Sequence, residues 1–193
     1  MTITDLLKAG LEHYQRGNLE GAEKKFRQVI LVDNSNIHGL NLLGMICVNT
    51  GRHEEAVHLI TDALKISPTD AQAQGNLGLA YQRMGNLKLA ESCFRKSIEL
   101  GGKNRTIFNS LGNVLRESGR ASEAVQVYES TLKVDGNYPE CWTNLSQALV
   151  DMGEFGRALQ AVSRALQIDP SLAEAHNQMA EVYRNTFKYD LAI

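Results

Sequence analysis

The 193-residue sequence contains no long apolar run, and this absence excludes a class of proteins. The longest uninterrupted apolar pieces, such as residues 42–48, fall far short of the roughly 18–20 residues that a membrane-spanning helix needs. Residues 1–5 also lack the basic segment, followed by an apolar one, that begins a secretory signal. We therefore expect a cytoplasmic protein that does not insert into a membrane.

Net charge and cysteine are equally scarce. With 20 basic and 22 acidic side chains, the chain lacks the excess of basic residues that a nucleic-acid-binding face requires. The three cysteines, Cys47, Cys93 and Cys141, are too far apart in the sequence for a zinc knuckle and are odd in number, which argues against a disulfide framework. We interpret them as buried thiols in a reducing compartment. No nucleic-acid partner, metal or other cofactor is expected.

What the sequence does contain is a repeat with a period of 34 residues. An alanine position and a glycine position both recur at this step: Ala22, Ala56, Ala90, Ala124, Ala158 and Ala192, with Gly17, Gly51, Gly85, Gly119 and Gly153. A small residue precedes each of these glycines by seven positions, and a helix-breaking residue marks a fourth position: Gly10, Gly44, Gly78, Gly112 and Ser146, with Asn34, Pro68, Gly102, Gly136 and Pro170. The period predicts a single array of tandem repeats with no domain boundary: residues 3–36, 37–70, 71–104, 105–138 and 139–172, with a partial sixth repeat at 173–193.

Apolar residues between these marks recur at helical spacing, so each repeat is predicted to consist of two helices and two turns. The glycine after the first helix would supply the left-handed residue that follows a helix C-terminus. The small residue of the first helix is expected to face the alanine of the second, so that the two helices approach closely. The fold class is therefore all-α, with each repeat resting on its neighbours.

The repeats resemble the tetratricopeptide repeat family. The third repeat carries the family pattern as Leu77-Gly78, Tyr81, Gly85, Ala90 and Phe94. The fifth repeat adds Trp142, Leu145, Gly153, Ala158 and Pro170. The resemblance implies an α-solenoid, a right-handed superhelix in which the first helix of every repeat lines a concave groove, and it implies that Trp142 is a core residue.

The positions that the resemblance assigns to the groove are rich in side-chain amides. We predict that the peptide-binding residues are Asn76, Arg83, Asn109, Asn113, Arg116, Asn144, Gln147, Asn177 and Gln178. Each amide carries donors and an acceptor, which match the backbone of an extended peptide without demanding particular side chains. The predicted function is a non-enzymatic scaffold that binds a protein or peptide segment, and the competing interpretation is a merely solvated polar face.

Comparison within the family leaves two alternatives open. Asn76 and Asn144 resemble the asparagine ladder in the repeat arm of O-linked N-acetylglucosamine transferases, which implies a substrate-recognition arm of a larger enzyme such as a glycosyltransferase. The cations of the carboxylate clamp used by chaperone-binding members are absent. The groove of the first two repeats is apolar and could hold an amphipathic helix or a partner repeat: Leu7, Leu11, Leu42, Met45 and Val48.

No catalytic or metal site is predicted. His53 and His58 are five residues apart, whereas a helical zinc motif needs four, so they do not share a helix face. The cysteines occupy packing positions. We therefore expect no enzymatic activity from the residues of this chain.

The sixth repeat departs from the pattern because Phe187 stands where the turn glycine is expected. A bulky residue is strained at positive φ, so either the turn is rebuilt around Asn185 or the first helix continues. No polar capping helix follows, although repeat arrays need one. These observations lead us to expect a fragment of a longer polypeptide, or a homo-oligomer formed through the uncapped C-terminal end as a self-assembling module.

Overall fold

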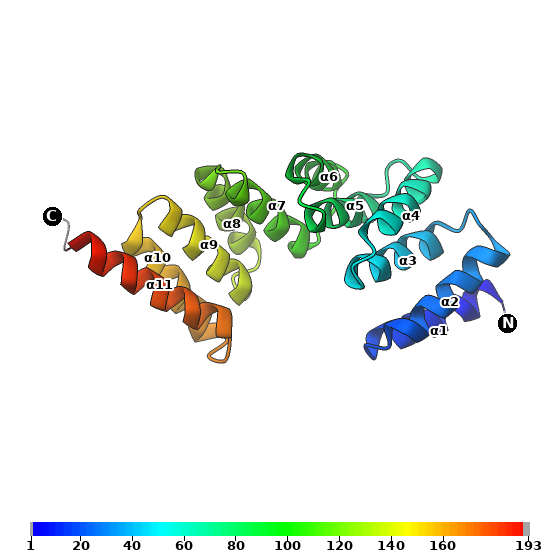
Figure 1. Ribbon diagram of the computed structural model, residues 1–193, viewed down its shortest axis with the longest axis horizontal. Helices are drawn as coiled ribbons and strands as arrows, with labels where there is room; N and C mark the ends of the chain where they lie inside the picture. Colours follow the sequence, from blue (N-terminus) through cyan, green and yellow to red (C-terminus); the bar gives the residue numbers. More distant parts are fainter. Residues whose placement is uncertain (1, 191–193) are drawn as a thin grey trace. The chain divides into compact units, whose positions relative to one another are not determined.

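The computed structural model describes the backbone of residues 2–190 and the side chains of residues 2–186, and this part of the chain consists of helices and their connections (Figure 1). The helices are α1 (Ile3–Gln15), α2 (Leu19–Val32), α3 (Ile37–Asn49), α4 (His53–Ile66), α5 (Ala71–Arg83), α6 (Leu87–Glu99), α7 (Arg105–Glu117), α8 (Ala121–Val134), α9 (Pro139–Asp151), α10 (Phe155–Ile168) and α11 (Ala173–Asp190). The prediction of an all-α fold is confirmed.

The helices form two compact units that divide between Gly102 and Lys103. The first unit holds the hairpins α1–α2, α3–α4 and α5–α6, and the second holds α7–α8, α9–α10 and then α11. Within a unit, the second helix of one hairpin packs on the first helix of the next. First helices also contact one another, α3 with α5 in the first unit and α7 with α9 and α9 with α11 in the second, where they form a layer.

Short polar residues define where many of the helices begin. The side chains of Asn18, Asn36, Asp70, Asn86 and Asn104 each accept a hydrogen bond from a backbone N–H of the first turn. Such caps satisfy donors that have no partner inside the helix. The second helices end shortly before the predicted breakers, so the period fixes both ends of these elements.

The turn glycines have the backbone conformation that the sequence predicted. All five lie at positive φ, between 73° and 80°. In the turn at Gly85, the N–H of Asn86 donates to the carbonyl of Tyr81 at 2.9 Å, which closes the helix end. The space around Gly85 is open, with no atom within 4 Å of an added Cβ, so the glycine is needed for its backbone alone.

Replacing Gly85 with alanine is therefore expected to lower the free energy of unfolding by about 1–2 kcal/mol, the strain of an L-residue in the left-handed region. Urea unfolding followed by far-UV circular dichroism measures the change. Gly85→Asn is the control, because asparagine tolerates positive φ better than alanine and should lose less stability. Equal losses in the two variants would contradict the backbone explanation.

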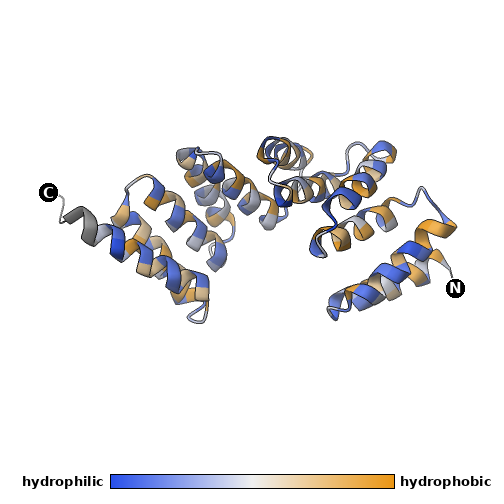
Figure 2. Cartoon of the chain, in the orientation of Figure 1, coloured by the Kyte–Doolittle hydropathy of each residue, from blue (hydrophilic) through white to orange (hydrophobic). Residues whose placement is uncertain are grey.

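The close approach of paired helices differs in one detail from the prediction. Where this small residue is a glycine, it faces the large residue that lies one turn beyond the alanine, whereas Ser146 in the fifth repeat donates to the carbonyl of the alanine itself, Ala158, at 2.8 Å. A Cβ on Gly10 would lie 2.4 Å from the ring of Phe26, and one on Gly78 would lie 2.5 Å from the ring of Phe94. The residues Phe26, Ile60, Phe94, Tyr128 and Val162 are wholly buried, as are the alanines four residues before them. In the hairpins that carry these glycines, the core is thus a series of large side chains inserted against them. Figure 2 shows hydrophobic and hydrophilic residues interspersed along the helices.

Two further expectations are resolved by the helices. Trp142 is only half-buried and its indole N–H donates to the carbonyl of Gly136 at 2.9 Å, so it covers the preceding turn instead of filling the core. Helix α11 continues through Asn185 and Phe187 to Asp190, which selects the second of the two alternatives for the sixth repeat. Ala192 lies outside the described residues.

Candidate functional site

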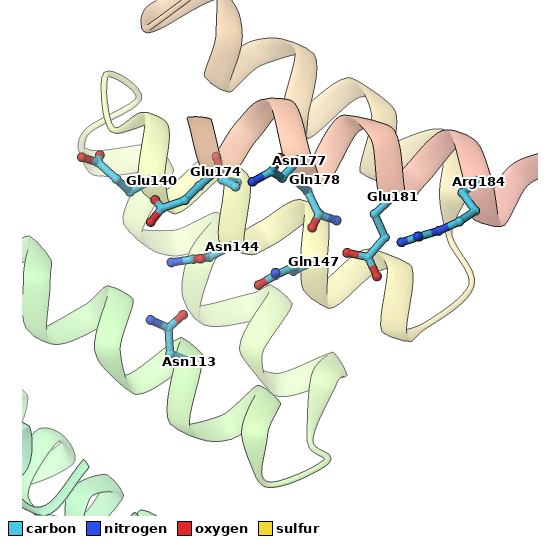
Figure 3. Close-up of a pocket in the computed structure, with 10 residues that line it drawn as sticks. Asn113, Glu140, Asn144, Gln147, Glu174, Asn177, Gln178, Glu181 and Arg184 are labelled. Atoms are coloured by element: carbon cyan, nitrogen blue, oxygen red, sulfur yellow. The ribbon is translucent and has the colours of Figure 1, made fainter. Parts of the chain in front are cut away.

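A polar pocket of about 620 Å³ lies on the first-helix layer of the second unit (Figure 3). Its walls come from α7, α9 and α11. The lining residues are Asn113, Glu140, Thr143, Asn144, Gln147, Glu174, Asn177, Gln178, Glu181 and Arg184. Five of the nine residues predicted to bind a peptide meet here: Asn113, Asn144, Gln147, Asn177 and Gln178.

Asn113 is held from behind by a buried tyrosine. The hydroxyl of Tyr128, on α8, donates to Oδ1 of Asn113 at 2.5 Å. Burial raises the pKa of Tyr128, so the phenol keeps its proton and remains a donor. With one lone pair of its oxygen occupied by Tyr128, the amide of Asn113 keeps both Nδ2 hydrogens as donors toward the pocket.

Asn144 is held through its side-chain nitrogen, whereas Asn113 is held through its oxygen. Its Nδ2 donates to Oδ1 of Asn109 at 3.1 Å, one repeat earlier on α7. Asn109 is 8% exposed, so the bond lies against the helix layer, whereas Asn144 remains half-exposed. The oxygen of Asn144 is therefore left as an acceptor for a ligand, beside the second hydrogen of Nδ2.

The same bond occurs in the first unit. Nδ2 of Asn76 donates to Oδ1 of Asn41 at 2.9 Å, again over 35 positions, and both residues are buried. Asparagines at these positions thus join consecutive first helices by side-chain hydrogen bonds. Asn41 was not among the residues predicted from the sequence, because each groove position was considered alone and not as a hydrogen-bond partner of the position one repeat away.

Gln178 occupies the equivalent position on α11, but its bond is missing. The residue one repeat earlier is Thr143, whose hydroxyl donates to the carbonyl of Pro139 in its own helix at 2.9 Å. Among the described residues, Nε2 of Gln178 has no hydrogen-bond partner, although the residue is only 3% exposed. Figure 3 shows this amide extending from α11 into the pocket.

The remaining predicted residues lie apart from the pocket. Asn109 and Asn76 take part in the helix-joining bonds described above. Arg83 is exposed near the end of α5 in the first unit. Arg116 donates to Asp151 at 3.3 Å, which joins α7 to α9.

Four charged residues of the pocket are absent from the predicted set: Glu140, Glu174, Glu181 and Arg184. Their positions follow the same register, because Glu140 and Glu174 are second in their repeats while Glu181 and Arg184 are ninth and twelfth in theirs. The sequence reasoning selected amides at these positions and passed over the carboxylates. The signal was therefore present in the sequence.

The apolar positions predicted for the groove of the first two repeats differ in exposure. Val48 is buried, and Leu7 and Leu42 are half-buried against the core of the first unit. Met45 is also half-buried, and Leu11 is 39% exposed. Val48, Leu7 and Leu42 therefore contribute to the packing of the first unit.

The cysteines are free thiols, as the sequence predicted, with Cys47 and Cys141 buried and Cys93 half-buried. Burial raises the pKa of Cys47 and Cys93 to about 11 and that of Cys141 to about 12. Thiols of this kind are poor nucleophiles near neutral pH. Over the residues that the structure describes, no three acidic, histidine or cysteine side chains gather in a way that could hold a metal ion.

None of the helices in the described part of the chain combines the length and apolar character needed to cross a bilayer. The finding agrees with the absence of long apolar runs in the sequence.

Sequence profiles of the tetratricopeptide repeat match most of the chain. One matches residues 35–101 and 69–137, and a second matches residues 115–182. Among curated proteins, ycf37 of Pyropia yezoensis is 30% identical over 99 residues, which are 49% of this chain and 56% of ycf37. The chain thus spans little more than half the length of that relative.

Solved structures share the fold at low sequence identity. TTC0263, a thermophilic tetratricopeptide repeat protein of Thermus thermophilus, superposes with a TM-score of 0.77 at 18% identity, covering 94% of this chain and 99% of that one. YrrB, described as a tetratricopeptide repeat protein with an unusual peptide-binding site, gives a TM-score of 0.69 at 20% identity over 83% of each chain.

Proposed function

Because the chain belongs to the tetratricopeptide repeat family, we propose that it is a protein-interaction scaffold whose second unit holds an extended peptide segment in the polar pocket. The observation that carries the proposal is the opposite anchoring of two neighbouring amides. Asn113 is fixed through its oxygen and Asn144 through its nitrogen.

This arrangement suits a peptide backbone. An extended strand presents N–H and C=O groups in alternation, and Asn113 offers a donor while Asn144 offers an acceptor. Both side chains are already fixed by intramolecular bonds, so little conformational entropy is lost when a ligand binds. Backbone recognition of this kind tolerates many side chains, as a scaffold for several partners requires.

The wider predictions remain proposals. We propose that the chain acts without catalysis of its own and in the cytoplasm, where free thiols persist. A substrate-recognition arm of a larger enzyme would use the same pocket to hold an acceptor peptide. Homo-oligomer formation remains a prediction from the sequence.

The test is a binding measurement with the Asn113→Ala/Asn144→Ala variant. Short random peptides displayed on phage are selected on the wild-type chain, and the selected peptides are synthesised with a fluorophore. We expect fluorescence anisotropy to show at least a roughly tenfold loss of affinity in the variant, because two directed hydrogen bonds are removed. Thermal unfolding of the variant establishes that it is folded at the assay temperature.

The control is Gln126→Ala/Gln160→Ala, which removes two exposed amides from the second helices α8 and α10. Its affinity should stay within about twofold of the wild type. A further variant, Gln147→Ala/Asn177→Ala, removes pocket amides that are not part of the helix-joining bonds, and it should also weaken binding. Failure to select any peptide, or unchanged affinity in both pocket variants, would contradict the proposal.

A further inference from the structure

The charge of the pocket is unevenly distributed. Figure 3 shows Glu140 and Glu174 at one end and Glu181 together with Arg184 at the other, with the amides between them. Glu140 and Glu174 both lie in the first turn of their helices, α9 and α11, and both are exposed. One end of the pocket therefore carries two carboxylates without a basic residue in the lining.

Within the described part of the chain, these two carboxylates form no hydrogen bond or ion pair. By contrast, Glu129 on α8 and Glu154, the residue before α10, both pair with Arg157. Arg105 is ion-paired with Asp135 at 2.5 Å, and this bond is the main reason that its pKa is raised, with Glu140 contributing least. Helix-dipole stabilisation accounts for an acidic residue in a first turn, so the pair alone would not indicate a ligand.

The unpartnered amide of Gln178 is the independent observation. A buried N–H group without a partner is destabilising by about 1–3 kcal/mol, and in most structures such groups are satisfied. Two equivalent residues, Asn76 and Asn144, find their acceptor on the preceding repeat. Only at Gln178, within this set of three, has the acceptor been replaced by a threonine that is occupied elsewhere. An acceptor supplied by a ligand would satisfy it.

The spacing of Gln178 and Glu174 connects the two observations. They are four residues apart on α11 and therefore lie on the same helix face, one turn from each other. A ligand carbonyl that accepts from Gln178 would place an adjacent side chain within reach of Glu174, and Glu140 borders the same end of the pocket. A long side chain with a terminal cation fits this arrangement, because it matches both carboxylates.

We infer that the pocket selects a peptide with a lysine or arginine side chain, seated at Glu140 and Glu174 while Gln178 binds a neighbouring backbone carbonyl. The inference rests on the proposed function and names its ligand class. Acidic peptides would be repelled by the same end of the pocket, and the cation would gain two charge-assisted contacts.

The test uses the full chain and the peptides selected on it by phage display. We expect lysine or arginine to recur at one position, and its replacement by glutamine to weaken binding roughly tenfold. The Glu140→Gln/Glu174→Gln variant, which keeps side-chain shape and removes both charges, should weaken binding of the original peptide by a similar factor. The glutamine peptide should bind wild type and variant about equally, because charge removal on either side then has no further effect.

The matched control is Glu20→Gln/Glu54→Gln. These glutamates are also exposed in the first turns of their helices, α2 and α4, so the variant has the same charge change and the same helix-dipole effect. Its affinity should remain unchanged. Exchanging lysine for arginine, or arginine for lysine, in the selected peptide and measuring the change in affinity shows which of the two cations the pocket prefers.

The outcomes separate the two proposals. Selected peptides without a recurrent basic residue, or peptides whose affinity survives Glu140→Gln/Glu174→Gln yet falls in Asn113→Ala/Asn144→Ala, overturn the cationic ligand and leave the scaffold function standing. Equal losses in the pocket variant and in the control would trace the effect to overall charge and also overturn it. Failure to select any peptide overturns both.

Discussion

Replacing Phe94 with alanine is expected to lower the stability of the first unit by about 3–5 kcal/mol, the largest effect of any single change considered. Phe94 lies on α6, is wholly buried, and packs its ring directly against Gly78 of α5. Because the facing residue is a glycine, no side chain at that position can move to fill the space. Truncation therefore leaves a cavity in addition to the lost burial of the ring.

Urea unfolding followed by circular dichroism measures this loss, and amide hydrogen exchange assigns it to α5 and α6. Phe94→Leu should lose less, since leucine fills part of the volume. Leu89→Ala on the same helix is the surface control, because Leu89 is 43% exposed and should change stability by less than about 1 kcal/mol. A loss below that value for Phe94→Ala would show that the hairpin does not depend on this insertion.

The sequence predicted the features of the fold that depend on local conformation. The turn glycines were identified because positive φ is a property of one residue, and the structure places all five there. The resemblance to tetratricopeptide repeats is confirmed by the profile matches, because the period brings small residues to the same position in every repeat. Caps such as Asn86 also act within a single turn, although they were not among the predicted features.

Features that depend on the rotation of one helix against another were predicted less well. The small residue was expected to face the alanine, whereas Gly78 faces Phe94, four residues after Ala90. Both residues lie on the same side of α6, so sequence spacing could not distinguish them. Trp142 was assigned to the core by analogy, but its ring N–H binds the turn carbonyl of Gly136.

The candidate site shows the same difference between features set by sequence position and features set by packing. The groove positions that the family resemblance implies assigned amides of α7, α9 and α11 to one surface, and in the structure these amides line one pocket. Which end of each amide is anchored depends on partners such as Tyr128 and Asn109, and these are set by three-dimensional packing. Hydrogen-bond polarity is therefore what the sequence could not provide, and it is the feature on which the proposed function depends.

The second large effect is expected at Gly112, where fold and site meet. A Cβ on Gly112 would lie 2.3 Å from Cε1 and 2.6 Å from Cζ of Tyr128. The ring is wholly buried and its hydroxyl holds Asn113, so it cannot shift without losing that bond. Overpacking at such a site is destabilising by about 1–3 kcal/mol, and we expect Gly112→Ala to lie at the upper end of this range.

Gly112→Ala should also weaken peptide binding under conditions where the variant remains folded, because displacement of Tyr128 releases the amide of Asn113. Tyr128→Phe separates the two effects, since it removes the hydroxyl without overpacking and should reduce affinity with a smaller loss of stability. Gly156→Ala is the matched control in the same unit. An added Cβ there meets nothing within 4 Å, and alanine in a helix is favoured over glycine by about 0.5–1 kcal/mol. If the stability changes at Gly112 and Gly156 have opposite signs, contact with Tyr128 decides the outcome. If Gly112→Ala leaves the stability unchanged, the ring has room to move, and Asn113 is less firmly held than its 2.5 Å bond implies.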